Sequence, residues 1–194
     1  ALLRNKQLSA HEVGHTLGYG HNYASSVNDR SSVMDYPHPL ITIKNGKLDL
    51  SDAYTRGIGE WDKVMIAYSY SDFPDGVDED KELDKILDKA FSSGLLFLSG
   101  QDAGDAHPLT HVWDNGKHPV DELVRMMKIR EIGLKTFSEK RIPVGTPMAT
   151  MEEVLVPLYL FHRYQIDAAG TMLGGLNYNH TLRGGVQKDP EIVP

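Results

Sequence analysis

Residues 11–21 read HEVGHTLGYGH. On a helix, His11 and His15 lie one turn apart on the same face, so both imidazoles can point at one ion. Gly18 readily adopts a positive φ, which can end the helix and return the chain so that His21 becomes a third ligand. Three nitrogen ligands leave one tetrahedral position open, as in catalytic rather than structural zinc sites. The stretch therefore predicts a helix that carries a zinc centre.

Glu12 follows the first histidine, close enough to reach a water on the metal without binding the metal itself. Zinc lowers the pKa of such a water, and a carboxylate can take its proton as general base. The back of the helix carries Ala10, Val13 and Leu17, an apolar stripe that we expect to pack on a core. The alternative is a chance H-E-x-x-H on an ordinary helix, but the eleven-residue form with a glycine and a third histidine is far more specific.

Residues 32–37, SVMDYP, follow a short polar loop. Together with the zinc motif they resemble the metzincin clan of zinc metalloproteases. The resemblance implies that Met34 is the methionine of a turn beneath the zinc, where it packs without ligating. It also implies that Tyr36 either binds zinc in the resting state or donates a hydrogen bond to the oxyanion. The alternative is an ordinary turn with a buried methionine and a surface tyrosine.

The residues after this turn line a substrate pocket in metzincins. The resemblance therefore implies that Leu40 and Ile41 form an apolar pocket for the side chain just beyond the scissile bond. His38 is a candidate fourth metal ligand, but it lies between Pro37 and Pro39, and we expect it to be held away at the surface.

The wider sequence resembles the C-terminal part of the catalytic domain in a family of large bacterial zinc-dependent metalloproteases of unknown function. The later motifs that carry this resemblance are GEWDK (59–63), AHP (106–108), HVWDNG (111–116), IPVGTPM (142–148), VPLY (156–159) and HRYQ (162–165). They are family markers to which no chemistry is assigned. The resemblance also implies export to the periplasm or the cell exterior.

The expected fold is mainly α with little β. It comprises a metzincin lower (C-terminal) subdomain that starts at the zinc-binding helix, plus a helical C-terminal region. We expect residues 1–75 to form the partial catalytic domain and residues 76–194 to pack on it. Helices are predicted at about 3–17, 60–70, 80–92, 119–138 and 150–172, the last with a capping box and a kink at Pro157. A hairpin is predicted around Asn45-Gly46 and a buried strand at 95–98.

Composition restricts the alternatives. The chain has 194 residues, 40% hydrophobic and 24% charged, with a net charge of -7 and no cysteine. Cysteine chemistry is therefore excluded, and nothing argues for nucleic-acid binding because no Lys/Arg-rich run is present. No apolar run approaches the ~20 residues of a membrane span.

The leading hypothesis is a peptidase with one zinc per chain that acts on a peptide or protein substrate. Three further hypotheses stand beside it. A second metal site at residues 101–118 (Asp102, Asp105, His107, His111, Asp114, His118) is conceivable, although its spacing matches no known metal loop. A non-catalytic zinc module that binds peptide or glycan is an alternative function, but such a module has no need of Glu12.

The third hypothesis concerns this chain. Metzincins build an upper subdomain before the zinc helix, whereas ten residues precede His11 here. We therefore expect this chain to need the missing N-terminal part of the same protein, and to be inactive or very weak, and poor at holding zinc, alone.

Overall fold

The computed structural model describes residues 2–100 and 107–185. Its helices are α1 (Leu2–Thr16), α2 (Glu60–Tyr70), α3 (Glu79–Ser92), α4 (Pro119–Lys135), α5 (Met151–Tyr159) and α6 (Arg163–Gly170). Three short 3-10 helices are η1 (Ser25–Asn28), η3 (Glu139–Arg141) and η4 (Met148–Thr150), and one hairpin pairs β1 (Thr42–Lys44) with β2 (Lys47–Asp49). The expectation of a mainly helical fold with little β is confirmed.

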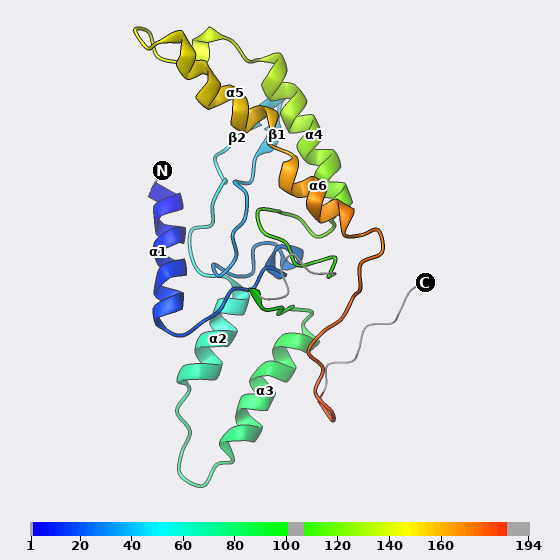
Figure 1. Ribbon diagram of the computed structural model, residues 1–194. Coiled ribbons are helices and arrows are strands. Elements are labelled where there is room, and N and C mark those ends of the chain that lie inside the picture. The colour runs from blue at the N-terminus through cyan, green and yellow to red at the C-terminus, as the bar shows by residue number, and fades with distance from the viewer. Residues whose placement is uncertain (1, 101–106, 186–194) are drawn as a thin grey trace.

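The elements form two helical groups around an irregular centre (Figure 1). Helices α2 and α3 pack side by side at one end, and α4 packs against α5 and α6 at the other, next to β2. Helix α1 runs along one side, and the segments that connect the helices fill the middle. The most deeply buried side chains include Met34 in this middle region and Met126 and Ile129 on α4.

Two local predictions are confirmed. The hairpin turns at Asn45-Gly46, where φ is 52° and 72°, as a two-residue turn with two positive φ angles requires. Helix α4 starts at Pro119 with Asp121 and Glu122 in its first turn, where a missing N–H and negative charges are best tolerated. It ends at Lys135, three residues before the predicted end.

The predicted strand at 95–98 is wrong. The backbone of these residues forms hydrogen bonds with side chains and not with a second strand. The Asn22 amide donates to the Leu96 carbonyl and accepts from the Leu98 N–H. The Asn28 side chain accepts from the Leu96 N–H and donates to the Gly94 carbonyl. Because two asparagines satisfy the backbone, the segment needs no neighbouring strand beyond one isolated bridge between Asn22 and Ser99.

The predicted final helix is two helices. Helix α5 ends at Tyr159, two residues after Pro157, and α6 starts at Arg163. A proline inside a helix removes one hydrogen bond and crowds the preceding turn, so a break close to it is expected. The predicted capping box also fails, because the Thr150 hydroxyl donates to the Pro147 carbonyl instead of capping α5.

The apolar stripe on α1 is only partly covered. Val13 is 55% exposed and Leu17 41% exposed, so this face is not packed into a core as predicted. It forms one wall of a shallow apolar pocket whose other wall includes Ile58, Met65 and Ile66. The buried face of α1 is the one that carries Gln7, His11 and Gly14.

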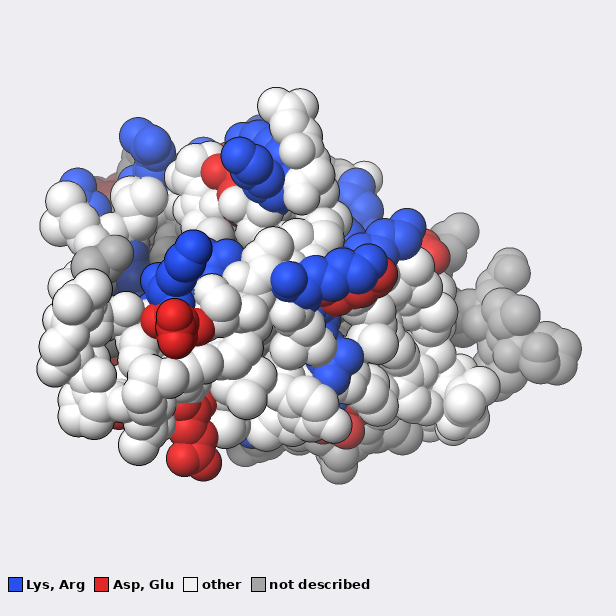
Figure 2. Space-filling model, turned by 90° about the horizontal axis from the view of Figure 1, so that it is seen from above, with Lys and Arg blue, Asp and Glu red and all other residues white. Residues whose placement is uncertain are grey.

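Within the described residues, none of the helices combines the length and the apolar character that crossing a membrane requires. On the face shown in Figure 2, lysines and arginines are interspersed with acidic side chains and broad uncharged areas. The charges on this face therefore do not form a single continuous patch of one sign.

Candidate metal centre

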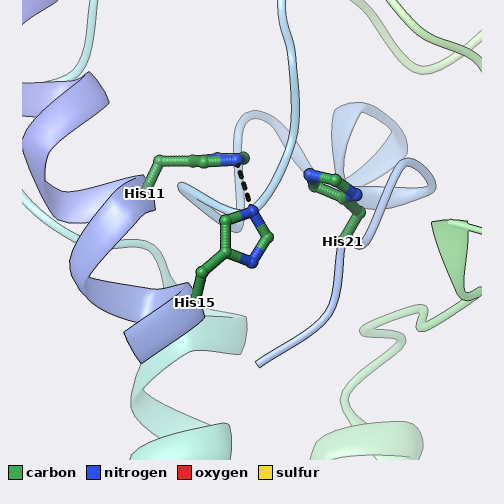
Figure 3. Close-up of side chains that lie close together, drawn as sticks. All are labelled: His11, His15 and His21. Carbon is green, nitrogen blue, oxygen red and sulfur yellow. Dashed lines mark hydrogen bonds between the residues drawn. The ribbon is translucent and has the colours of Figure 1, made fainter. Parts of the chain in front are cut away.

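Three histidines converge at the end of α1 (Figure 3). His11 and His15 project from successive turns of the helix, and their Nε2 atoms are 3.0 Å apart. His21 reaches them from the segment that follows, so that one nitrogen of each ring lies within 4.8 Å of the others. The structure therefore brings together the three residues that the sequence predicts as metal ligands, which we call the histidine cluster.

Gly18 allows the chain to turn back toward the cluster. Its φ is +89°, a backbone conformation that residues other than glycine rarely adopt. The Tyr19 N–H donates to the Gly14 carbonyl, which closes the helix end just after this turn. The chain reverses at this point, and His21 follows three residues later.

Hydrogen bonds fix the tautomers of two rings. His11 Nδ1 lies 2.7 Å from the Val33 carbonyl oxygen, and His15 Nδ1 lies 2.9 Å from that of Tyr19. Because a carbonyl only accepts, both Nδ1 atoms must donate, and both neutral rings keep the Nε2 lone pair free. Two lone pairs that face each other at 3.0 Å repel unless a cation lies between them. Tetrahedral zinc with Zn–N distances of 2.0–2.1 Å separates its nitrogens by roughly 3.3 Å, so the spacing of the His11 and His15 nitrogens is close to that of two zinc ligands.

The electrostatic setting favours the neutral forms of His11 and His21. Burial lowers the pKa of His11, and the charge of His15 lowers it further against the opposing effect of the Val33 carbonyl. Burial also lowers the pKa of His21, followed by the charges of His11 and His15, while Glu12 acts in the opposite direction. Neutral imidazoles are the form that binds metal, so the lowered pKa values of His11 and His21 favour metal binding.

Met34 lies directly beneath the zinc helix and is 1% exposed. A Cβ added to Gly14 would lie 2.3 Å from Met34 Sδ, closer than real atoms approach. The Met34 side chain can therefore keep this position against α1 only while residue 14, between the two helical histidines, is glycine, and a larger residue would force it to shift. This residue was not singled out from the sequence, although its place inside the zinc motif was the available signal.

Asp62, at the start of α2, fixes the same turn from below. Its buried carboxylate accepts from the Ser32 hydroxyl at 2.6 Å, the Val33 N–H at 2.9 Å and the Gly59 N–H at 2.6 Å. A Cβ on Gly59 would lie 1.9 Å from the Ser31 carbonyl oxygen. The GEWDK motif, which had no assigned role, thus holds the turn whose Val33 carbonyl orients His11.

Tyr36 lies beside the histidine cluster. Its hydroxyl is 3.0 Å from His21 Nε2, and its ring stacks on His11 with centroids 4.7 Å apart. The Glu12 side chain is exposed at the start of the motif. Tyr36 is therefore placed at the cluster, whereas Glu12 acts on His11 and His21 through its charge, which opposes the lowering of their pKa values by burial.

The predicted pocket residues lie farther along the chain. Leu40 and Ile41 are half-buried and lead into the hairpin, where Leu40 N–H donates to the Ala53 carbonyl and the Ile41 carbonyl accepts from Arg125. His38 is not in the cluster, but neither is it at the surface as predicted. It is half-buried and packs edge-on against Phe161.

Two buried carboxyl groups support the turn from the side. Asp35 accepts from the Ser25 hydroxyl at 2.7 Å and from the Tyr36 N–H, and burial raises its pKa to about 7. Burial and the nearby charge of Asp35 raise the pKa of Asp114, which accepts from the Ser26 hydroxyl at 3.3 Å. Desolvation of the charged form explains both shifts.

The structure gives no support to a second metal site at residues 101–118. Asp102 and Asp105 lie outside the described residues. His107 and His111 interact with the carbonyls of Tyr178 and Pro108, respectively. In the described ranges, the histidine cluster is the only place where three potential metal ligands lie close together.

A helix that presents two histidines, a glycine turn that returns a third and a methionine turn beneath them define a metal-binding domain of the metalloprotease type. A family model described as Met-zincin matches residues 1–194, so the chain belongs to the Met-zincin family. This match confirms the resemblance to the metzincin clan drawn from the sequence motifs. Searches of curated proteins and of solved structures found no significant match.

Proposed function

We propose that this chain carries the zinc centre of an endopeptidase. The observation that supports this function best is the pair of Nε2 atoms of His11 and His15, which face each other while both Nδ1 atoms are engaged by carbonyls. With His21 they form a three-nitrogen donor set that leaves a fourth position for a water or a substrate. Each of the three imidazoles would bind the ion through one ring nitrogen.

The bound ion would polarise the scissile carbonyl and lower the pKa of the attacking water. The Glu12 carboxylate would accept the proton from that water and later deliver it to the nitrogen of the leaving amine. The Tyr36 hydroxyl, placed beside His21, would donate a hydrogen bond to the carbonyl oxygen as negative charge develops on it. The Val33 and Tyr19 carbonyls would keep His11 and His15 in the tautomer that binds the ion.

The proposed function also assigns residues to the substrate-binding cleft. Residues 1–75 would form the floor of the cleft, as a metzincin lower subdomain, with Leu40 and Ile41 lining the pocket just beyond the scissile bond. Export to the periplasm or the cell exterior is proposed on the family resemblance alone.

The test combines metal analysis with cleavage of a peptide library, both on the 194-residue chain and on the longest natural form of the protein. Glu12→Gln should retain zinc but lose cleavage by about 10²–10⁴-fold, the usual contribution of a general base. Glu60→Gln, an exposed glutamate on α2, is the matched control and should cleave normally. Unchanged cleavage by Glu12→Gln would refute the mechanism, and zinc binding without any cleavage would favour a binding module.

A further inference from the structure

The HVWDNG segment, residues 111–116, reaches the metal centre from the C-terminal half of the chain. The Trp113 ring stacks on Tyr36 with centroids 5.4 Å apart and an interplanar angle of 15°. Tyr36 in turn stacks on His11, and its ring also has tilted contacts with His21 and Tyr23, so Trp113 is the stacked neighbour that lies outside the histidine cluster. The segment thus contacts the residue whose hydroxyl faces the site.

Backbone contacts fix the same region. The Trp113 N–H donates to the Tyr36 carbonyl at 2.9 Å, and the buried Asn115 side chain donates to the His38 carbonyl at 3.0 Å. Two of the three carbonyls between Tyr36 and His38 are therefore held by residues that lie more than 70 positions away. These bonds fix the main chain that carries the phenol.

Trp113 itself has an unfavourable backbone conformation. Its φ is +66°, in the left-handed region that bulky residues avoid. Such conformations persist where the surroundings enforce them, and they cluster at functional sites. Trp113 is also only half-buried, unlike Trp61, which is 4% exposed and packs in the interior. Filling a core is thus an incomplete explanation for this indole.

We propose that Trp113 is a positioning residue that holds the Tyr36 hydroxyl at the reacting centre. The inference rests on the proposed peptidase function. The indole restricts the tilt of the phenol ring, while the bond from Trp113 N–H fixes the turn that carries it. Trp113 acts through Tyr36 and has no role in binding zinc.

A double-mutant cycle tests this role. Trp113→Leu removes the stacking surface, Trp113→Phe retains an aromatic face, and Tyr36→Phe removes the hydroxyl. We expect Trp113→Leu to lower kcat by about 10-fold or more with little change in KM, up to the 10²–10³-fold cost of losing a donor to the oxyanion. The double variant should cleave no more slowly than Tyr36→Phe alone, and Trp113→Phe should retain most of the rate. Zinc content should be the same in all variants.

A second measurement does not depend on activity. In the zinc-free protein with ¹³C-labelled tyrosine, the spectrum of Tyr36→Phe assigns the Tyr36 ring signals. Trp113→Leu should shift these signals markedly because the ring current of the indole is lost, while the signals of the distant, exposed Tyr70 stay in place. If the longest natural form of the protein cleaves nothing, the proposed function fails, but this spectrum still decides whether Trp113 orders Tyr36.

Three results would overturn the inference. The first is an unshifted Tyr36 signal in Trp113→Leu. The second is a double variant whose losses multiply, which would mean that the two residues act independently. The third is a loss of zinc in Trp113→Leu that parallels its loss of cleavage, which would make Trp113 a structural support of the metal.

Discussion

Removing the Asp62 carboxylate tests how the methionine turn is held. In Asp62→Ala, the Val33 and Gly59 N–H groups and the Ser32 hydroxyl lose their acceptor. Each buried group left unsatisfied costs about 1–3 kcal/mol, so the buried Val33 N–H and Ser32 hydroxyl predict a loss of roughly 2–6 kcal/mol. This is a large part of the about 5–15 kcal/mol by which a domain is usually stable.

Asp62→Asn should cost much less, roughly 1–2 kcal/mol, because one amide oxygen can still accept from both N–H groups. Glu60→Ala is the matched control on the same helical turn. Glu60 is exposed and pairs with Lys63, and such surface pairs contribute about 0–1 kcal/mol. Urea unfolding of the three variants gives the free energies. We would abandon this explanation if Asp62→Ala unfolded at the same urea concentration as Glu60→Ala.

The same substitution should weaken the metal centre. The Val33 carbonyl orients His11, and Asp62 holds the Val33 N–H. Substitutions in groups that orient ligands typically cost about 10–100-fold in metal affinity, so chelator competition should show a loss of this size in Asp62→Ala. Zinc affinity equal to that of the unmodified protein would show that the turn does not orient His11 in solution.

Three other predictions concern the surroundings of the histidine cluster. Gly14→Ala should lower stability by up to about 2 kcal/mol, because the cost of overpacking Met34 (about 1–3) exceeds the gain in helix propensity (about 1), while Gly20→Ala, which meets no atom, should be neutral in urea unfolding. Burial raises the pKa of Asp35 to about 7, above 3.8 in the unfolded chain, so stability should fall as pH rises between these values. Asp35→Asn should therefore gain about 2–3 kcal/mol relative to the unmodified protein between about pH 5 and 8 by thermal unfolding, and a constant difference would contradict the burial argument. Because burial lowers the pKa of His11 and of His21 below the usual 6.5, zinc affinity in chelator competition should hold down to that pH and fall only in more acidic solution, and a fall that begins well above pH 6.5 would contradict this.

The parts of the fold that could be predicted are those with local signals. The spacing of His11 and His15 follows from one helical turn, and the hairpin follows from the conformations that Asn45-Gly46 adopts. The start of α4 follows from the missing N–H of Pro119. In each case the residues that carry the signal lie within one or two turns of the structure they specify, so no knowledge of distant contacts is needed.

The incorrect predictions have a common cause in distant contacts. The apolar run at 95–98 resembled a strand, but the side chains of Asn22 and Asn28 satisfy its backbone from more than 60 residues away. The stripe of Val13 and Leu17 was assigned to a core because periodicity identifies an apolar face but not what covers it. In both cases the local pattern was recognised correctly, and the partner could not be inferred from it.

The contacts that support the metal centre were the least predictable, although they explain two family motifs. Asp62 holds the methionine turn from α2, while Trp113 and Asn115 hold the chain just after it from the C-terminal half. Single polar side chains that bind a distant backbone leave no periodic signal, so GEWDK and HVWDNG could be recognised only as markers. A centre whose ligand His11 is oriented by a carbonyl of an irregular turn is only as rigid as that turn. We therefore expect substitutions at Asp62 and Trp113 to impair this centre in different ways, the first through the orientation of a ligand and the second through the position of the Tyr36 hydroxyl.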